Sequence, residues 1–250
     1  MRVLYAGDEK LETPQFFAGA ESFQVYNKVV KDYEPLLEAL EGTDGVDPEH
    51  LGGQAAVGEF PDDVAALDAY DVLILSDLSC GTLQPHFREG AIPGPNRLHA
   101  IRDWVKDGGA LVFCGGWMTY QGYRGVGNWA GSAVAEVLPV TVRNVFDDRV
   151  ERPDGAAVAD VTPDHPVTTD LDWANGPTIY GYNRVGQVEE SARCLARVDG
   201  DPLLAVGEAG DGRVVSYTSD PGVMWGLGLI EWGDYEAFWT NVLDWVTGPT

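Results

Sequence analysis

The sequence predicts an α/β fold of the flavodoxin-like, doubly wound kind, in which a mostly parallel sheet carries helices on both faces. Three short apolar runs, at residues 2–6, 71–77 and 110–114, are nearly continuous. Such runs are typical of strands that are covered on both faces. Between them lie stretches whose apolar residues recur at helical spacing, and this alternation is typical of βαβ units. The 250 residues are enough for the one domain that we expect over residues 1–250.

Each element of the first half is predicted from its local pattern. Helices are predicted where apolar residues recur every three or four positions, and the two longer ones are closed by Gly42 and by Gly108-Gly109. Strands are predicted where the apolar residues follow one another without a break. In chain order, we expect a strand at 2–6, helices at 32–40 and 64–67, a strand at 71–77, a helix at 96–107 and a strand at 110–114.

The character of the chain changes after Leu138-Pro139. Residues 140–198 are richer in Asp, Pro, Thr and short β-prone runs, and they contain no strong helical pattern. We interpret residues 140–200 as a β-rich insertion near the carboxyl edge of the sheet. Strands at 203–206 and 213–218 and a helix at 235–246 then return to the core.

The charge excludes some functions. The chain has 40 acidic and 16 basic residues, a formal net charge of -24, and its acids are scattered rather than gathered in a tail. Such a surface repels phosphate backbones and anionic membranes, so we expect neither nucleic acid nor a membrane as partner. No apolar run is long enough for a membrane span, and the run at the N-terminus is too short for a signal peptide, which predicts a cytoplasmic protein.

The same acidic composition favours halophilic adaptation, because dissolved salt screens the repulsion among scattered carboxylates. Only four lysines accompany them: Lys10, Lys28, Lys31 and Lys106. The alternative is an ordinary acidic protein from a mesophile.

Candidate site residues follow from the predicted sheet, because an open parallel sheet binds ligands beyond the carboxyl ends of its strands. Cys114 is a candidate nucleophile there, since it precedes two glycines and so fits half of the pattern G-x-C-x-G, with Val112 in place of the first glycine. The alternative is a small buried apolar residue. The cysteines and histidines are too scattered to predict a metal site, and we expect no cofactor.

Two further segments allow two interpretations each. The aromatic stretch with Trp225, Trp232 and Trp239 could stack on a sugar or another flat ligand, or it could pack the last helix and form a subunit interface. As an exposed aromatic cluster it would indicate a homo-oligomer, most simply a two-fold dimer. The segment Asp147-Asp148-Arg149 could bind a cation or act in acid–base chemistry, but solvated carboxylates are the favoured interpretation.

The motifs together resemble the class I glutamine amidotransferase-like family, and more distantly the trehalose-utilisation-like proteins, with which His165-Pro166 is shared. The resemblance spans Gly7 to Trp245 and implies the flavodoxin-like fold of that family. It rests on Pro95-Asn96-Arg97, Gly108-Gly109, Gly115-Gly116-Trp117, Tyr120-Gln121-Gly122, Asn128-Trp129, Leu138-Pro139-Val140, Asp147-Asp148-Arg149, Gly181-Tyr182-Asn183-Arg184, Asp201-Pro202-Leu203-Leu204, Thr218-Ser219-Asp220, Trp232, Tyr235 and Trp239.

The chain departs from a working glutaminase of this kind, which needs a cysteine, a histidine that activates it and an acid that orients the histidine. Where relatives tend to carry a histidine before Trp225, this chain has Met224, and no histidine follows His165. We therefore expect a protein that is not a glutaminase and that binds a small polar ligand, with carbohydrate as one candidate class. A hydrolase or amidotransferase that uses Cys114 is the alternative. The expected ligand-binding residues are Asp77, Ser79, Gly115, Gly116, Trp117, Gln121, Asn183, Asp220 and Trp225.

Overall fold

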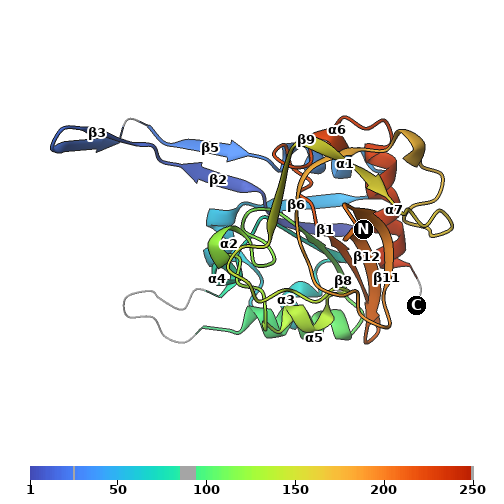
Figure 1. The fold of residues 1–250 in the computed structure, drawn as a ribbon. Helices are drawn as coiled ribbons and strands as arrows, with labels where there is room; N and C mark the ends of the chain where they lie inside the picture. Colours follow the sequence, from blue (N-terminus) through green and yellow to red (C-terminus); the bar gives the residue numbers. More distant parts are fainter. Residues whose placement is uncertain (25, 85–93, 249–250) are drawn as a thin grey trace.

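The computed structural model describes residues 1–24, 26–84 and 94–248. A nine-stranded sheet in the order β10-β9-β11-β12-β13-β8-β7-β1-β6 forms its centre (Figure 1). Its strands are β1 (Arg2–Gly7), β6 (Asp47–Leu51), β7 (Val72–Ser76), β8 (Ala110–Cys114), β9 (Arg149–Ala159), β10 (Thr178–Asn183), β11 (Arg193–Val198), β12 (Asp201–Ala209) and β13 (Gly212–Tyr217).

Helices occupy the connections between these strands. The α-helices are α1 (Glu34–Gly42), α2 (Gly53–Glu59), α3 (Val64–Leu67), α4 (Cys80–Leu83), α5 (Arg97–Lys106), α6 (Leu227–Ile230) and α7 (Tyr235–Thr247), and the short 3₁₀ helices are η1 (Tyr123–Gly125), η2 (Val134–Val137) and η3 (Trp173–Asn175). No helix in the described ranges is both long enough and apolar enough to cross a membrane.

The parallel core of the sheet confirms the predicted fold class. Strands β13, β8, β7 and β1 are parallel neighbours, and they contain the four apolar runs around Val214, Leu111, Val72 and Val3. Strand β6 pairs with β1 in parallel at the edge, although its polar sequence, which includes Pro48, carried no strand signal. Proline is tolerated on an edge strand because no neighbour needs its missing N–H.

Successive side chains of each central strand point to opposite faces of the sheet, and both faces are covered by helices. One core joins alternate strand residues such as Val3 and Val112 to α1 and α7. The other joins the intervening residues, such as Leu4 and Leu111, to α2 and α5. This two-sided burial explains why the central strands are apolar throughout.

The β-rich segment predicted at 140–200 extends the sheet. Strands β9, β10 and β11 continue beyond β12 with antiparallel pairing. The sheet is therefore mixed, with a parallel half that holds β1, β6, β7, β8 and β13 and an antiparallel half formed by the later part of the chain.

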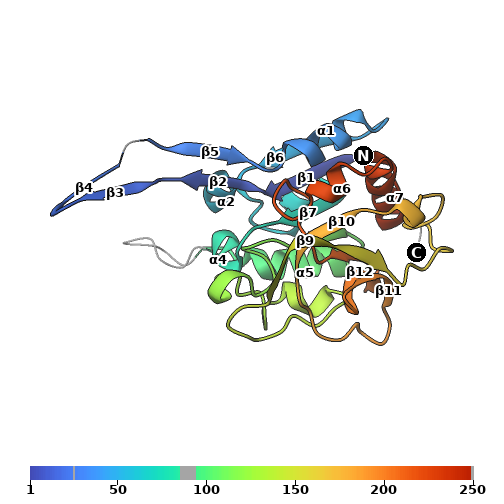
Figure 2. The ribbon, with the colours of Figure 1, turned by 45° about the horizontal axis from the view of Figure 1, so that its top comes forward.

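A long β-ribbon, here called the arm (residues 9–31), leaves the body of the protein directly after β1 and was not predicted. Both ribbon views show it projecting away from the sheet (Figures 1 and 2). Its base pairs β2 (Glu9–Glu12) with β5 (Lys28–Lys31), and its tip pairs β3 (Gln15–Ala18) with β4 (Glu21–Gln24). Most of its side chains are exposed. Its sequence lacks a buried apolar run, which is why no strand was predicted there.

The expectation of an exposed tryptophan cluster is wrong. Trp225, Trp232 and Trp239 are 2%, 8% and 1% exposed. Trp232 and Trp239 pack with Phe238 in the core between α7 and the sheet. These aromatic residues therefore hold the last helix in place, and they give no support to a subunit interface.

We expect the stability of the protein to rise with salt, because 40 acidic side chains cannot all be paired by 16 basic ones. Screening by molar KCl reduces their mutual repulsion. A thermal melt between 0.1 M and 3 M KCl should show a midpoint that rises by roughly 10 °C or more, because 1 kcal/mol shifts the midpoint of a domain of this size by about 2–4 °C. A midpoint that stays level or falls over this range would contradict the halophilic interpretation.

Candidate functional site

Three aspartates follow strands of the parallel half of the sheet and meet at its carboxyl edge. Asp8 follows β1, Asp77 follows β7, and Asp220 lies three residues beyond β13. Asp8 and Asp77 have left-handed backbone conformations, with φ of 49° and 42°. All three side chains are buried. Strand-end positions in neighbouring parallel strands converge in space, so the topology explains why these acids lie together.

Lys10 is the cation of this cluster. Its Nζ lies 2.9 Å from Asp77 Oδ2 and 3.0 Å from Asp32 Oδ2. Met224 stands where the family resemblance would place a histidine, and its Sδ lies 3.1 Å from the same Nζ. Lys10 belongs to β2, so the base of the arm supplies the positive charge of the site.

One lysine does not neutralise this number of buried carboxylates, and the pKa values reflect it. Burial, followed by the charge of Asp77, raises the pKa of Asp8 to about 7. Burial and the charges of Asp8 and Asp77 also raise the pKa of Asp220. Burial lowers the pKa of Lys10, but the charges of Asp77, Asp220 and Asp32 outweigh this effect and raise it overall. Strongly perturbed groups of this kind are frequent at functional sites.

Cys114 is the last residue of β8, and the described residues around it do not activate a nucleophile. Its side chain is fully buried. Burial, with the negative charges of Asp8 and Asp220, raises the pKa of the Cys114 thiol, so the sulfur stays neutral at pH 7. The strained backbone of the following turn occurs at Gly116, with φ of 148°, whereas a nucleophile elbow places the strain at the nucleophile itself.

The backbone amides after Cys114 are already hydrogen bonded within the protein. Gly115 N donates to the carbonyl oxygens of Tyr217 and Ser219, at 2.7 and 2.8 Å. Gly116 N donates to Asn183 Oδ1 at 2.9 Å. Oxyanion stabilisation requires donors that face the reacting oxygen. These two amides therefore do not offer an oxyanion hole at Cys114.

No histidine in the described ranges is hydrogen bonded to the Cys114 sulfur. His50 Nε2 instead lies 2.9 Å from the Gly7 carbonyl oxygen, and its ring stacks on Tyr33. His165 Nδ1 accepts a hydrogen bond from Val167 N at 3.2 Å. His86 lies outside the described residues.

Asp148 is buried, which corrects the interpretation of Asp147-Asp148-Arg149 as solvated carboxylates. Its Oδ2 accepts a hydrogen bond from Gln121 N at 2.9 Å, and its Oδ1 accepts from Gly122 N at 2.8 Å and from Asn183 Nδ2 at 2.9 Å. Asp148 and Asn183 together fix the loop after β8 to the end of β10. Asp147 is partly exposed and pairs with Arg149.

A pocket of about 500 Å³ opens beside this cluster, between the base of the arm, α2, α4 and the turn after β8. Of the predicted ligand-binding residues, Asp77, Ser79 and Trp117 line it. The other lining residues are Glu9, Lys10, Leu11, Glu12, Gly53, Gln54, Leu78, Thr82, Met118 and Met224. The volume suits a small molecule.

The remaining predicted residues do not line this pocket. Gly115, Gly116 and Asn183 form the hydrogen-bonded turn behind it, and Asp220 belongs to the buried carboxylate cluster. Gln121 is buried beside Asp148. Trp225 Nε1 donates to Glu151 Oε2 at 3.0 Å, and the indole lines a different pocket. The arm residues that line the site, Lys10 above all, were missed because nothing in the sequence shows that the chain folds back there.

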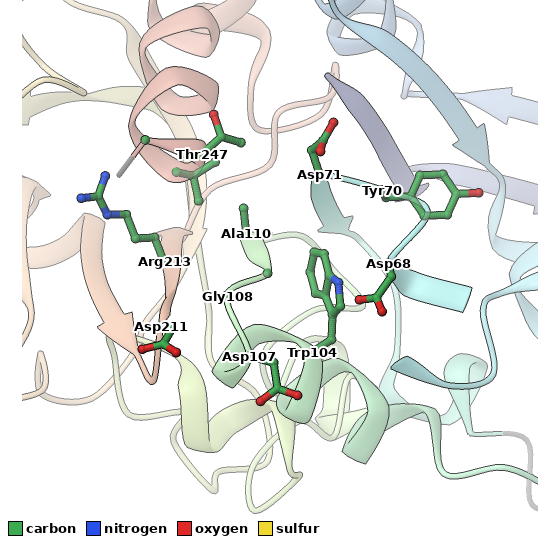
Figure 3. Close-up of a pocket in the computed structure, with 13 residues that line it drawn as sticks. Asp68, Tyr70, Asp71, Trp104, Asp107, Gly108, Ala110, Asp211, Arg213 and Thr247 are labelled. Carbon is green, nitrogen blue, oxygen red and sulfur yellow. The ribbon is translucent and has the colours of Figure 1, made fainter. Parts of the chain in front are cut away.

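A second polar pocket lies at the opposite edge of the sheet, at the start of β8 and β13 (Figure 3). It has a volume of about 300 Å³ and contains Asp68, Asp71, Asp107 and Asp211 with Arg213. Ligands of open α/β sheets bind at the carboxyl edge, so we place the candidate site there and not in this pocket. Within the described part of the chain, no group of His, Cys, Asp or Glu is arranged to hold a metal ion.

The fold, with its polar cluster at the carboxyl edge of the parallel strands, defines the class of protein as an α/β protein with the class I glutamine amidotransferase-like fold. Residues 2–248 match the model of the GATase1-like family, which is described as "Putative glutamine amidotransferase". The chain belongs to this family. No curated protein matches the chain.

Solved structures agree with this assignment. Two cytoplasmic proteins of Salmonella typhimurium, the second from strain LT2, are each 31% identical to the chain, with TM-scores of 0.89 and 0.90. In both comparisons 98% of this chain and 99% of the other are covered. A ThuA-like protein of Parabacteroides merdae shares the fold at 10% identity, with a TM-score of 0.57 over 98% of this chain and 89% of that one.

Proposed function

We propose that the protein is not a glutaminase and binds a small, neutral, hydroxyl-rich ligand, of which a carbohydrate is the favoured class, in the pocket beside Lys10. The observation that carries the proposal is the lining of that pocket. It combines the indole of Trp117 with the amide of Gln54 and the hydroxyls of Ser79 and Thr82, whereas the Asp77 carboxylate behind them is held by Lys10 and by Met118 N. The apolar surface of an indole suits the C–H groups of a sugar ring, while amide and hydroxyl groups suit its hydroxyls.

The surroundings of Trp117 support this role because they hold its ring in place. The ring stacks on Tyr123, and the Arg149 guanidinium lies 4.3 Å from its centroid. Ser79 Oγ lies 2.9 Å from Thr82 Oγ1 at the start of α4. A ligand would therefore meet side chains that are already positioned, which lowers the entropic cost of binding.

The alternative, a hydrolase or amidotransferase that uses Cys114, has less support. Its thiol is buried, its pKa is raised, and the neighbouring amides are hydrogen bonded elsewhere. A cytoplasmic location is supported by the two Salmonella relatives, which are described as cytoplasmic.

We expect no ammonia release from glutamine by the protein in molar KCl at pH 7–8, and no difference between wild type and Cys114→Ala. The reason is that a neutral, buried thiol without a base cannot attack an amide. A coupled ammonia assay measures this directly. Turnover of glutamine that depends on Cys114 would overturn the non-glutaminase proposal.

The ligand itself is tested by calorimetric titration with a panel of neutral mono- and disaccharides in molar KCl. We expect at least one to bind, and Gln54→Ala to weaken its binding about 3- to 10-fold, which is the loss of one hydrogen bond. Gln187→Ala is the matched control, because that side chain is also exposed but lies outside the pocket. If no saccharide binds at 10 mM, or if Gln54→Ala binds as wild type does, the carbohydrate proposal is wrong.

A further inference from the structure

The arm exposes apolar side chains at a density that the surface of the body does not match. Phe17 is 79% exposed, Phe23 and Tyr26 are about half exposed, and Phe16 stacks on Phe23 with ring centroids 5.9 Å apart. Leu11 and Val29 continue the apolar surface toward the base. Contiguous exposed apolar residues mark contact surfaces, and an isolated two-stranded ribbon is only marginally stable in water. The arm therefore has the properties of a segment that is covered by a partner.

The charge distribution indicates which partner. Residues 9–31 contain three glutamates and three lysines, so the arm is formally neutral and the whole net charge of -24 belongs to the rest of the chain. Three of the four lysines of the protein, Lys10, Lys28 and Lys31, lie on the arm. Two bodies of this charge repel each other, whereas a formally neutral arm can approach an acidic body without this repulsion. A second copy of this chain offers such a body.

The body also offers a place for the aromatic tip of the arm. An apolar pocket of about 380 Å³ is lined by Pro153, Tyr180, Met224, Trp225 and Leu227, together with the charged Glu151. Val223, Met224 and Leu227 beside it are more than a third exposed. The pocket is large enough for one aromatic ring.

We propose that the arm of one copy docks on the body of a second copy and places its phenylalanine tip in the apolar pocket beside Leu227. Reciprocal docking closes a two-fold dimer, the simplest closed arrangement. Met224 lines both this pocket and the ligand pocket. A docked arm therefore lies next to the ligand site of the partner, although the docking does not depend on what that site binds.

Light scattering in molar KCl tests the docking. We expect wild type to have the mass of a dimer at 50 µM, twice the 27.0 kDa of the chain. The triple variant Phe16→Ser, Phe17→Ser, Phe23→Ser should be monomeric, because it removes the apolar tip without touching the core. Phe146→Ser is the matched control, since Phe146 is 73% exposed on the body, and it should remain dimeric. A monomeric wild type, or a triple variant that remains dimeric, would overturn the proposal.

Substitutions in the pocket beside Leu227 test the docking independently of the arm. Leu227→Asp should also produce monomers, and a thermal melt like that of wild type would show that the variant is folded. When Phe17→Cys and Leu227→Cys are mixed and oxidised with diamide, we expect a disulfide-linked dimer of the two variants. Phe17→Cys mixed with Phe146→Cys should give none, and this mixture also controls for the native Cys194. Equal cross-linking in the two mixtures would rule out the pocket beside Leu227.

Discussion

Replacing Asp148 by alanine is expected to lower the free energy of unfolding by about 3–5 kcal/mol, at the upper end of single substitutions. The substitution removes the acceptor for three buried donors at once, namely Gln121 N, Gly122 N and Asn183 Nδ2. Each unpaired buried donor costs about 1–3 kcal/mol. Denaturant unfolding in molar KCl measures the loss.

Asp147→Ala is the matched control for this experiment, because it changes the adjacent carboxylate in the same motif. Asp147 is partly exposed and its Oδ2 pairs with Arg149 Nη2 at 3.0 Å. A pair of this kind contributes about 1 kcal/mol or less. If Asp148→Ala costs no more than Asp147→Ala, the loop after β8 is held by something other than the Asp148 carboxylate.

The central strands were predictable because a strand that is buried on both faces is apolar throughout. The longer helices were predictable because their apolar residues recur at helical spacing. The runs at 71–77 and 110–114 correspond to β7 and β8. Strand β6 and the arm carry no such record, since β6 is a polar edge strand and most arm side chains face solvent. An exposed strand needs only backbone pairing, and backbone pairing leaves little trace in side-chain pattern.

The candidate site was predictable in part for a related reason. Strand-end positions follow from the topology, so Asp77 and Asp220 could be named before the structure. Lys10 could not, because its role depends on the base of an arm that no sequence signal predicted. The burial of Asp148 was also not predictable, since a charged triplet in an acidic chain is usually solvated and only its three donors explain its position.

The carboxylate cluster around Lys10 is expected to reduce the stability of the folded protein. Asp8 is fully buried, and its Oδ2 accepts a hydrogen bond from Tyr5. Asp77 and Asp220 add negative charge, and Lys10 compensates only part of it. A polar cluster that reduces stability at the carboxyl edge is typical of a functional site, where preorganised charge is retained at the expense of stability.

Asp8→Asn should therefore stabilise the protein at pH 8, and the effect should depend on pH in a defined direction. The pKa of Asp8 is raised to about 7 in the folded state from 3.8. The folded protein thus holds this proton more tightly than the unfolded chain does, and the stabilising contribution is fully present below pH 4. It is lost as the pH rises from about 4 to about 7, because only the unfolded chain releases the proton freely there. The difference between a pKa of 3.8 and one of about 7 corresponds to about 4 kcal/mol.

Urea unfolding of wild type and Asp8→Asn at pH 4, 6 and 8 in molar KCl measures this difference. Asparagine keeps the shape and can still accept the Tyr5 hydroxyl, but it does not titrate. The variant should be more stable than wild type by about 3–4 kcal/mol at pH 8, by less at pH 6, and by little or nothing at pH 4. Asp68→Asn, an exposed carboxylate, should change stability by no more than about 0.5 kcal/mol at each pH. A difference for Asp8→Asn that does not vary with pH would show that Asp8 ionises as readily in the folded protein as in the unfolded chain.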